Sequence, residues 1–270
     1  MRVIREVCVS GKVIDVTVKV PSGHHSDQRA PRREITPEKV QKNNEKLAAK
    51  KLTRIINANF DRNSSHDMLT YAGKTTPSPE EAVKLFDKFI RKLRREMQKH
   101  GLELKWVMST EYATKRIHHH FITNAPTEMV EDLWQYGEVI RSPFLKDPNR
   151  YKLGEYIIKE TSSTFRLKDC PFSCRYRHSR NLVMPKPQIE EVDARQLSDD
   201  PVAWKGYYID PNTVRRYEHP ITGLEHLEYM MISLDEKPRL KKYYKGKTKR
   251  REDNYQRYIN HIEEQLSLLK

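Results

Sequence analysis

The sequence predicts an α+β fold, and three observations support this prediction. Residues 106–123 (WVMSTEYATKRIHHHFIT) contain two runs of alternating character joined by a short polar turn at residues 113–116, as in a β-hairpin. Residues 78–101 carry apolar side chains at helical spacing between a capping box and a glycine. Residues 204–234 contain two further β-rich pieces, WKGYYI and LEYMMISL. A chain of 270 residues is long enough for one large domain with appendages.

Composition and charge indicate the class of partner. Hydrophobic residues make up 36% of the chain and charged residues 33%, so a core can form while much of the chain stays solvated. Nine positive charges and no acid fall within residues 237–251, out of a net charge of +14. A polyanion, and nucleic acid first among polyanions, is therefore the expected partner. Three cysteines make no disulfide framework, and no transmembrane run or signal peptide is evident, so we expect a cytoplasmic protein without a membrane partner.

The remaining elements follow from local patterns. Residues 1–20 alternate as a strand or a hairpin turning at Gly11. The Thr36-Pro37-Glu38 sequence begins a long helix with an apolar stripe through Ile56. Further along, we expect short strands at residues 67–71 and 138–144, a short helix at 126–134 and a helix begun by Asp147-Pro148 that runs to Thr161. Residues 185–201 are proline-bearing and acidic, as in a linker, and the chain closes with an amphipathic helix that could pair with a second copy.

The central hairpin predicts a metal site. If Tyr112 closes the turn opposite Ile117, then Glu111 faces His118, Ser109 faces His120 and Val107 faces Ile122. Glu111, His118 and His120 then share one face, while the other is apolar, with Trp106, Met108, Tyr112, Ile117 and Phe121. One carboxylate and two imidazoles suit a divalent metal with open coordination positions. A slip of one residue would replace them by His119, and the alternative reading is a surface histidine run.

The helix near residue 156 carries a second group of interest. Tyr156 and Lys159 are three residues apart and therefore neighbours on one face. Tyr151 lies about 140° around the helix from Tyr156, so the two tyrosines do not point into one site. Taken alone, Tyr156 is equally explained as a core or rim aromatic.

These motifs together resemble the rolling-circle replication initiators of the HUH endonuclease superfamily, of the type found in phages, plasmids and integrated elements of Gram-positive bacteria. A first motif appears as Met68-Leu69-Thr70-Tyr71, the metal motif as His118-His119-His120 and the nucleophile motif as Tyr156-Ile157-Ile158-Lys159. The middle residue of the metal motif is His119 rather than an aliphatic residue, which leaves open which histidines bind metal. With a single tyrosine on the proper face, a one-tyrosine enzyme is expected.

The resemblance implies a fold, a reaction and partners. The expected fold is an RRM/ferredoxin-like antiparallel sheet backed by helices, with a basic C-terminal extension. The expected reaction is metal-dependent nicking and religation of single-stranded origin DNA, with Mg²⁺ or Mn²⁺ held by Glu111, His118 and His120, Tyr156 as the nucleophile and Lys159 beside it. A host helicase and polymerase would complete replication. Candidate DNA-binding residues are Arg175, Tyr176, Arg177, Arg180, Lys241, Lys242, Tyr243, Tyr244, Lys249 and Arg250.

Three segments are expected on this basis: residues 1–58 with N-terminal strands and a helix, 59–182 as the endonuclease core, and 183–270 as a C-terminal extension with a small β unit, the basic run and the final helix. A relaxase or transposase of the same superfamily is an alternative because chemistry and metal are shared. A non-haem iron oxygenase and a non-catalytic nucleic-acid-binding protein are alternatives from other classes.

Overall fold

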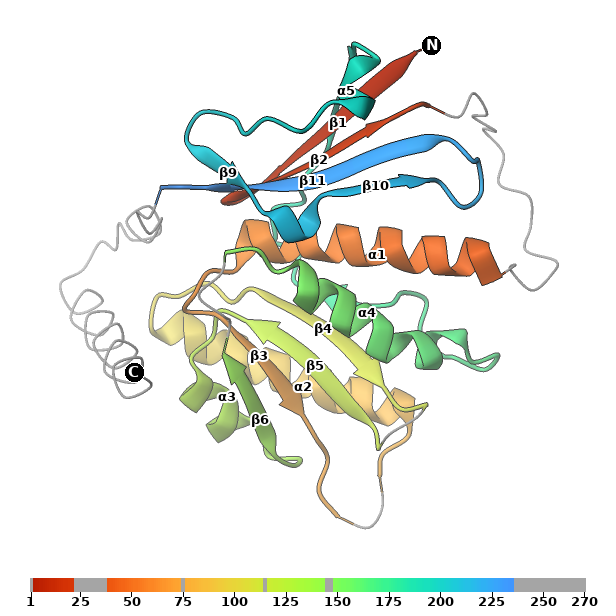
Figure 1. The fold of residues 1–270 in the computed structure, drawn as a ribbon. Coiled ribbons are helices and arrows are strands. Elements are labelled where there is room, and N and C mark those ends of the chain that lie inside the picture. The colour runs from red at the N-terminus through yellow and green to blue at the C-terminus, as the bar shows by residue number, and fades with distance from the viewer. Residues whose placement is uncertain (1, 22–37, 74–75, 114–115, 144–147, 236–270) are drawn as a thin grey trace. The chain divides into compact units, whose positions relative to one another are not determined.

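A computed structural model describes residues 2–21, 38–73, 76–113, 116–143 and 148–235 (Figure 1). The chain divides into two compact units that exchange segments along the sequence. The first unit contains Met1–Asn59, Asp147–Lys159 and Val183–Glu236, and the second contains Phe60–Lys146 and Glu160–Leu182 among its described parts. The fold is α+β, and every strand pair in both sheets is antiparallel. In the described part of the chain, no helix has both the length and the apolar character needed to span a bilayer.

The first unit is a six-stranded sheet with helix α1 (Glu38–Asn59) along one face (Figure 1). The strands follow the order β10-β11-β2-β1-β8, and β9 also pairs with β11. Their bounds are β1 Val3–Ser10, β2 Val13–Lys19, β8 Gln188–Val192, β9 Tyr207–Ile209, β10 Arg215–Glu218 and β11 Glu225–Ser233. Two short elements accompany them, α5 (Arg195–Ser198) and the 3-10 turn Pro211–Thr213. Strands from both ends of the chain therefore belong to one sheet.

The predicted N-terminal hairpin is confirmed, with its turn at Gly11. Gly11 has φ +64°, and a Cβ atom there would lie 2.2 Å from the backbone oxygen of Asn57. Glycine is the residue that tolerates both the left-handed backbone and this close approach. The hairpin turn is thereby packed against the last turn of α1.

The linker predicted at residues 185–201 is wrong, because this segment contains β8 and α5. β8 pairs with the neighbouring strand β1, and its two glutamates form ion pairs with arginines at the start of the chain: Arg5–Glu190 at 2.8 Å and Arg2–Glu191 at 3.2 Å. The acidic composition that suggested a solvated linker instead complements a basic neighbouring segment.

The second unit is a five-stranded sheet in the order β6-β3-β5-β4-β7. The strands are β3 Ser65–Leu69, β4 Trp106–Glu111, β5 His118–Thr123, β6 Val139–Pro143 and β7 Arg177–His178, and the helices are α2 (Pro79–Lys99) and α3 (Thr127–Leu133). From β3 to β6 the elements follow the order β-α-β-β-α-β. The strands expected at residues 67–71 and 138–144 and the helix at 126–134 are thus present, with shifted bounds.

One face of this second sheet forms an apolar core with α2. The predicted capping box is present at Ser78 and Glu81, and Gly101 follows the helix with φ +73°. Side chains of α2 meet the hairpin's apolar face in a cluster that includes Phe86, Phe89, Leu93, Met97, Trp106, Met108, Ile117 and Phe121. The helices cover this face, so the metal-type residues lie on the other face.

Helix α4 (Tyr151–Arg166) crosses the boundary between the units, since residues up to Lys159 belong to the first and those from Glu160 to the second. The predicted start at Asp147-Pro148 is wrong by a few residues. Asn149 Oδ1 accepts a hydrogen bond from the backbone N–H of Tyr151 at 3.2 Å, so Asn149 caps the helix. The helix also continues beyond Thr161, the predicted end, to Arg166.

Candidate metal centre

The hairpin register predicted from the sequence is confirmed. β4 and β5 pair antiparallel with Glu111 opposite His118, Ser109 opposite His120 and Val107 opposite Ile122. Because side chains alternate between the two faces of a strand, this register places Glu111, His118 and His120 on one face.

These three side chains form a compact group of metal-ligand type. One ligand atom from each of Glu111, His118 and His120 lies within 4.8 Å of the other two, and all three residues are buried. His118 Nε2 lies 3.3 Å from Glu111 Oε2, and the two imidazole rings are 5.1 Å apart between centroids. Two nitrogens and a carboxylate at this separation fit a divalent cation, and together they leave coordination positions for a substrate.

The second nitrogen of each ligand-type histidine is oriented by another group. His118 Nδ1 donates to the backbone oxygen of Arg116 at 2.8 Å, which leaves Nε2 as its lone-pair nitrogen. His120 Nδ1 lies 3.2 Å from Nε2 of His66, with the two rings stacked at 5.4 Å. Such outer partners fix the ring and the tautomer of metal-binding histidines. Both histidines are therefore held in the arrangement that a ligand needs.

His66 is a site residue that the sequence reasoning missed. It lies on β3, which pairs with β5, so that Met68 is opposite His120 and His66 opposite Ile122. The only signal in the sequence was its position two residues before Met68, on the same face of the strand expected there. Which strand would lie beside β3 could not be read from that local pattern.

His119 points to the opposite, apolar face and is fully buried. Its Nε2 lies 2.7 Å from the Tyr71 hydroxyl and its Nδ1 lies 2.9 Å from Thr110 Oγ1. Tyr71 donates its proton to the backbone oxygen of Ala82 at 3.0 Å, so the network fits a His119 that donates from Nε2 and accepts at Nδ1. His119 is therefore a core residue that links the first motif to the metal strand.

Burial shifts several titratable groups of the second sheet. It lowers the pKa of His66 to about 4 and, with a smaller contribution from His118, that of His119 to about 3. Both imidazoles are neutral at pH 7. Burial also raises the pKa of Asp67 to about 6, although a hydrogen bond from Ser65 opposes this.

Tyr156 and Lys159 lie on α4 within the first unit, whereas the Glu111–His118–His120 group belongs to the second. Both side chains are exposed, Tyr156 to 40%, while the intervening Ile157 and Ile158 are buried. The predicted face of Tyr156 is thus the outer face of the helix. In the second unit, Thr164 Oγ1 of the same helix accepts hydrogen bonds from the backbone N–H groups of Tyr112 and Ala113, directly after β4.

The candidate DNA-binding residues near position 177 form part of the sheet rather than a loop. β7 pairs with β4, and Arg177 forms an ion pair with Asp87 of α2 at 2.8 Å. The Arg175 guanidinium lies over the Phe165 ring at 4.6 Å, and burial raises the pKa of Tyr176 to about 12. Arg180 is exposed. The remaining candidates, Lys241, Lys242, Tyr243, Tyr244, Lys249 and Arg250, and the final helix lie outside the described residues.

An antiparallel sheet with helices on one face and a buried carboxylate–imidazole group on the other defines a metal-site protein of α+β class. Residues 68–165, which include the first motif, the metal hairpin and Tyr156, match the family described as replication-associated protein ORF2 and phage gene II protein. This segment belongs to that family of rolling-circle replication initiators. No curated protein and no solved structure matches the chain significantly.

Proposed function

We propose that the protein is a metal-dependent nickase and ligase of single-stranded DNA that initiates rolling-circle replication through a covalent tyrosine intermediate. The observation that carries this proposal is the buried group of Glu111, His118 and His120, located inside the segment that matches the replication-associated family. The β-α-β-β-α-β order of the second unit supports a ferredoxin-like core for the enzyme.

The three ligand-type side chains would hold a divalent ion that polarises the scissile phosphate. Two imidazoles favour Mn²⁺ alongside Mg²⁺, because Mg²⁺ prefers oxygen ligands throughout. His66 and the Arg116 carbonyl hold the two histidine rings in place through their Nδ1 atoms. Binding would therefore require little rearrangement of the hairpin.

Tyr156 is proposed as the nucleophile. Its hydroxyl oxygen attacks phosphorus, the bond to the 3′ oxygen breaks, and the phenolic proton is lost while the departing 3′ oxygen takes one up. The products are a 5′-phosphotyrosine link and a free 3′-OH that can prime synthesis. One phosphodiester replaces another, so the reverse reaction religates the strand. Lys159, one helical turn away, would stabilise negative charge on the phosphate or phenolate.

The decisive experiment is to trap the intermediate. Wild-type protein, Tyr156→Phe and the matched control Tyr151→Phe are incubated with Mn²⁺ and single-stranded DNA that contains the element's origin. We expect a protein–DNA adduct from wild type and from Tyr151→Phe, and none from Tyr156→Phe. The phenylalanine keeps the ring and removes one oxygen, so the helix should fold normally.

Mass spectrometry of the adduct identifies the modified peptide directly. A phosphotyrosine on a peptide without Tyr156 would refute the assignment of the nucleophile. A wild-type protein that binds the DNA but forms no adduct with Mn²⁺ or Mg²⁺ would refute the nickase itself and favour a non-catalytic role.

A further inference from the structure

The first unit contains a polar interface where a helix covers a sheet. One face of its sheet is apolar, with Val7, Val16 and Leu227 in a core cluster. The alternate positions on the same strands carry Glu6, Asp15 and Glu228, and these face α1. An interface of this kind between a helix and a sheet is ordinarily apolar, so its charged composition calls for an explanation.

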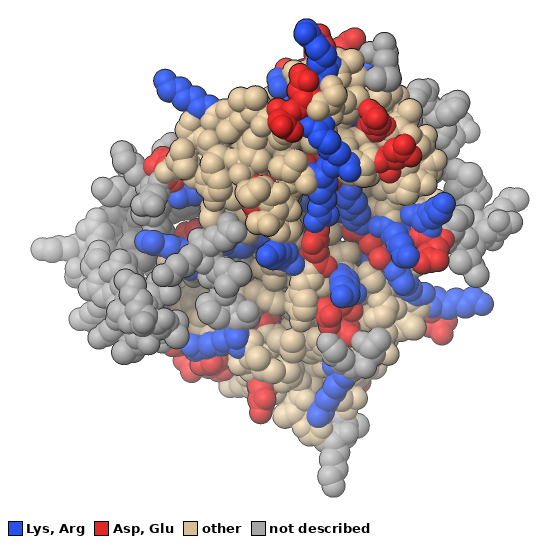
Figure 2. All heavy atoms as spheres, viewed as in Figure 1, with Lys and Arg blue, Asp and Glu red and all other residues tan. Residues whose placement is uncertain are grey.

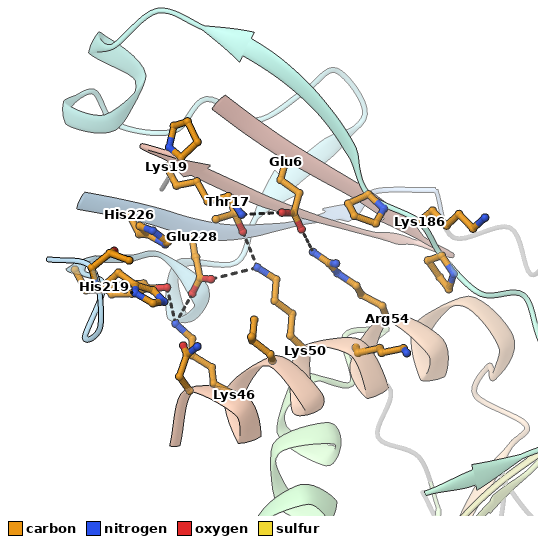
Figure 3. A pocket seen from close by; sticks show the side chains of 18 of the residues that line it. Glu6, Thr17, Lys19, Lys46, Lys50, Arg54, Lys186, His219, His226 and Glu228 are labelled. Carbon is orange, nitrogen blue, oxygen red and sulfur yellow. Dashed lines mark hydrogen bonds and ion pairs between the residues drawn. The ribbon is translucent and has the colours of Figure 1, made fainter. Parts of the chain in front are cut away.

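A stripe of basic residues on α1 meets these carboxylates. Lys46, Lys50 and Arg54 are four residues apart and so share one face of the helix. Lys46 pairs with Glu228 at 2.8 Å and Lys50 contacts Glu228 at 3.2 Å (Figure 3). Arg54 pairs with Glu6 at 3.0 Å and with Asp15 at 3.2 Å. Lys19, on β2, pairs with Glu6 at 3.0 Å. On the face shown in Figure 2, Lys and Arg side chains likewise lie among Asp and Glu side chains over α1 and the strands beside it.

These pairs form part of the wall of a pocket of about 600 Å³ between α1 and the sheet. Two further cations, Lys51 of α1 and Lys186, also line the pocket. Both are exposed, and no ion pair to either is found among the residues that the structure describes. The remaining lining is mixed, with apolar Leu47, Ile55 and Met184 and the rings of Tyr217, His219 and His226.

The charges in this pocket do not balance. Six lysine or arginine side chains line it, whereas three carboxylates, including Asp15 behind the wall, oppose them. Burial alone would raise the pKa of Glu228, but Lys50 and Lys46 lower it to about 2, so this carboxylate is ionised and its charge is already matched. A surplus of three positive charges remains, two of them on Lys51 and Lys186.

A purely structural role explains the paired charges but not the surplus. Leu52, Ile55 and Ile56 already bury the apolar side of α1 completely or nearly so. Buried ion pairs commonly add less stability than apolar residues of the same size would. A network that served only to attach the helix would need no additional exposed lysines at the rim.

We propose that this pocket binds a nucleotide unit of single-stranded DNA, with the phosphate at Lys51 and Lys186 and the sugar and base against the apolar and aromatic lining. The volume lies within the range of roughly 300–1,000 Å³ that is typical of ligand pockets and so exceeds the needs of a bare anion. Ion pairs join the helix to the sheet across the gap, so an extended single strand fits better than a duplex. The choice of DNA over a free nucleotide rests on the proposed function.

The test measures binding of a fluorescent single-stranded oligonucleotide to the full-length protein in EDTA, where cleavage does not occur, over a series of salt concentrations. The pocket variant is Lys51→Gln/Lys186→Gln. The matched control, Lys88→Gln/Lys92→Gln, removes two exposed charges from α2 in the second unit. Thermal denaturation of all three proteins verifies that each is folded.

Two lost phosphate contacts should reduce the slope of log affinity against log salt by about 1.4, at roughly 0.7 for each contact with a single strand. The control should leave the slope near the wild-type value. An equal change in both variants, or no change in the pocket variant, would overturn the proposed site. Thymidine monophosphate provides a second arm: if it binds the wild-type protein as tightly as the oligonucleotide does, the ligand is a free nucleotide and the strand is ruled out.

Adduct formation by the wild-type protein with Mn²⁺ is scored separately. Its absence would refute the nickase and would leave the pocket measurement standing. Conversely, an unchanged slope in the pocket variant would refute the pocket without bearing on the adduct.

Discussion

Replacement of His119 by alanine should destabilise the fold while leaving metal binding intact. The imidazole is fully buried, packs against Phe86 at 5.3 Å between ring centroids, and contacts Tyr71 and Thr110 through both nitrogens. Truncation leaves a cavity in the aromatic core and removes two hydrogen bonds, each worth about 1 kcal/mol. We expect a loss of about 3 kcal/mol in the free energy of unfolding, and a decrease of about 6–12 °C in Tm.

The assay compares the thermal denaturation of four proteins with and without Mn²⁺: wild type and the alanine variants of His118, His119 and His120. A ligand that binds only the folded protein stabilises it by about 2.7 kcal/mol at a hundred times its Kd. Wild type and His119→Ala should show this metal-dependent increase in Tm, the variant from a lower starting temperature. His118→Ala and His120→Ala should lose it, because each removes one ligand nitrogen.

The three adjacent histidines thus separate stability from metal binding within one strand. A metal-dependent shift that is lost in His119→Ala and kept in either neighbour would refute the assignment of faces. A His119→Ala variant as stable as wild type would refute the role of this side chain in the core.

Three further predictions concern other parts of the chain. His66→Ala should lower Mn²⁺ affinity about 10–100-fold by calorimetry because His120 loses its outer partner; His66→Gln, whose amide oxygen can accept from Nδ1, should restore part of it, and an unchanged affinity in the alanine variant would contradict the positioning role. Below pH 6.5 the unfolded chain binds more protons than the folded one at His66 and His119, so stability of the metal-free protein should fall as pH falls, with a slope of up to about 2.7 kcal/mol per pH unit. Asp67, with its raised pKa, acts in the opposite direction and offsets about half of this slope below pH 6, and urea denaturation that is constant from pH 7 to 5 would disprove the effect. Removal of residues 237–270, with nine positive charges in the basic run, should weaken DNA binding and flatten its salt dependence, whereas an unchanged salt slope would show that the run makes no phosphate contacts.

Local sequence patterns were enough to assign the two faces of the central hairpin. The period of a strand is two, and a register shifted by one residue would have buried polar side chains and exposed Trp106, Met108 and Phe121. The same pattern assigned His119 to the core side. The bounds of α2 were equally local, since the capping box at Ser78 and the glycine at 101 act within one helical turn. Such features depend on neighbours close in sequence and can therefore be read from it.

The pairing of distant strands, by contrast, became visible in the folded chain alone. His66 reaches His120 because β3 lies beside β5, across 54 positions of sequence. Residues 188–192 form a strand because Arg2 and Arg5 offer partners for their glutamates, whereas the local composition indicated a linker. The basic stripe of α1 looked solvated, yet it meets carboxylates from β1, β2 and β11. In each case the deciding contact joins segments far apart in the chain, and local periodicity carries no information about which segments fold together.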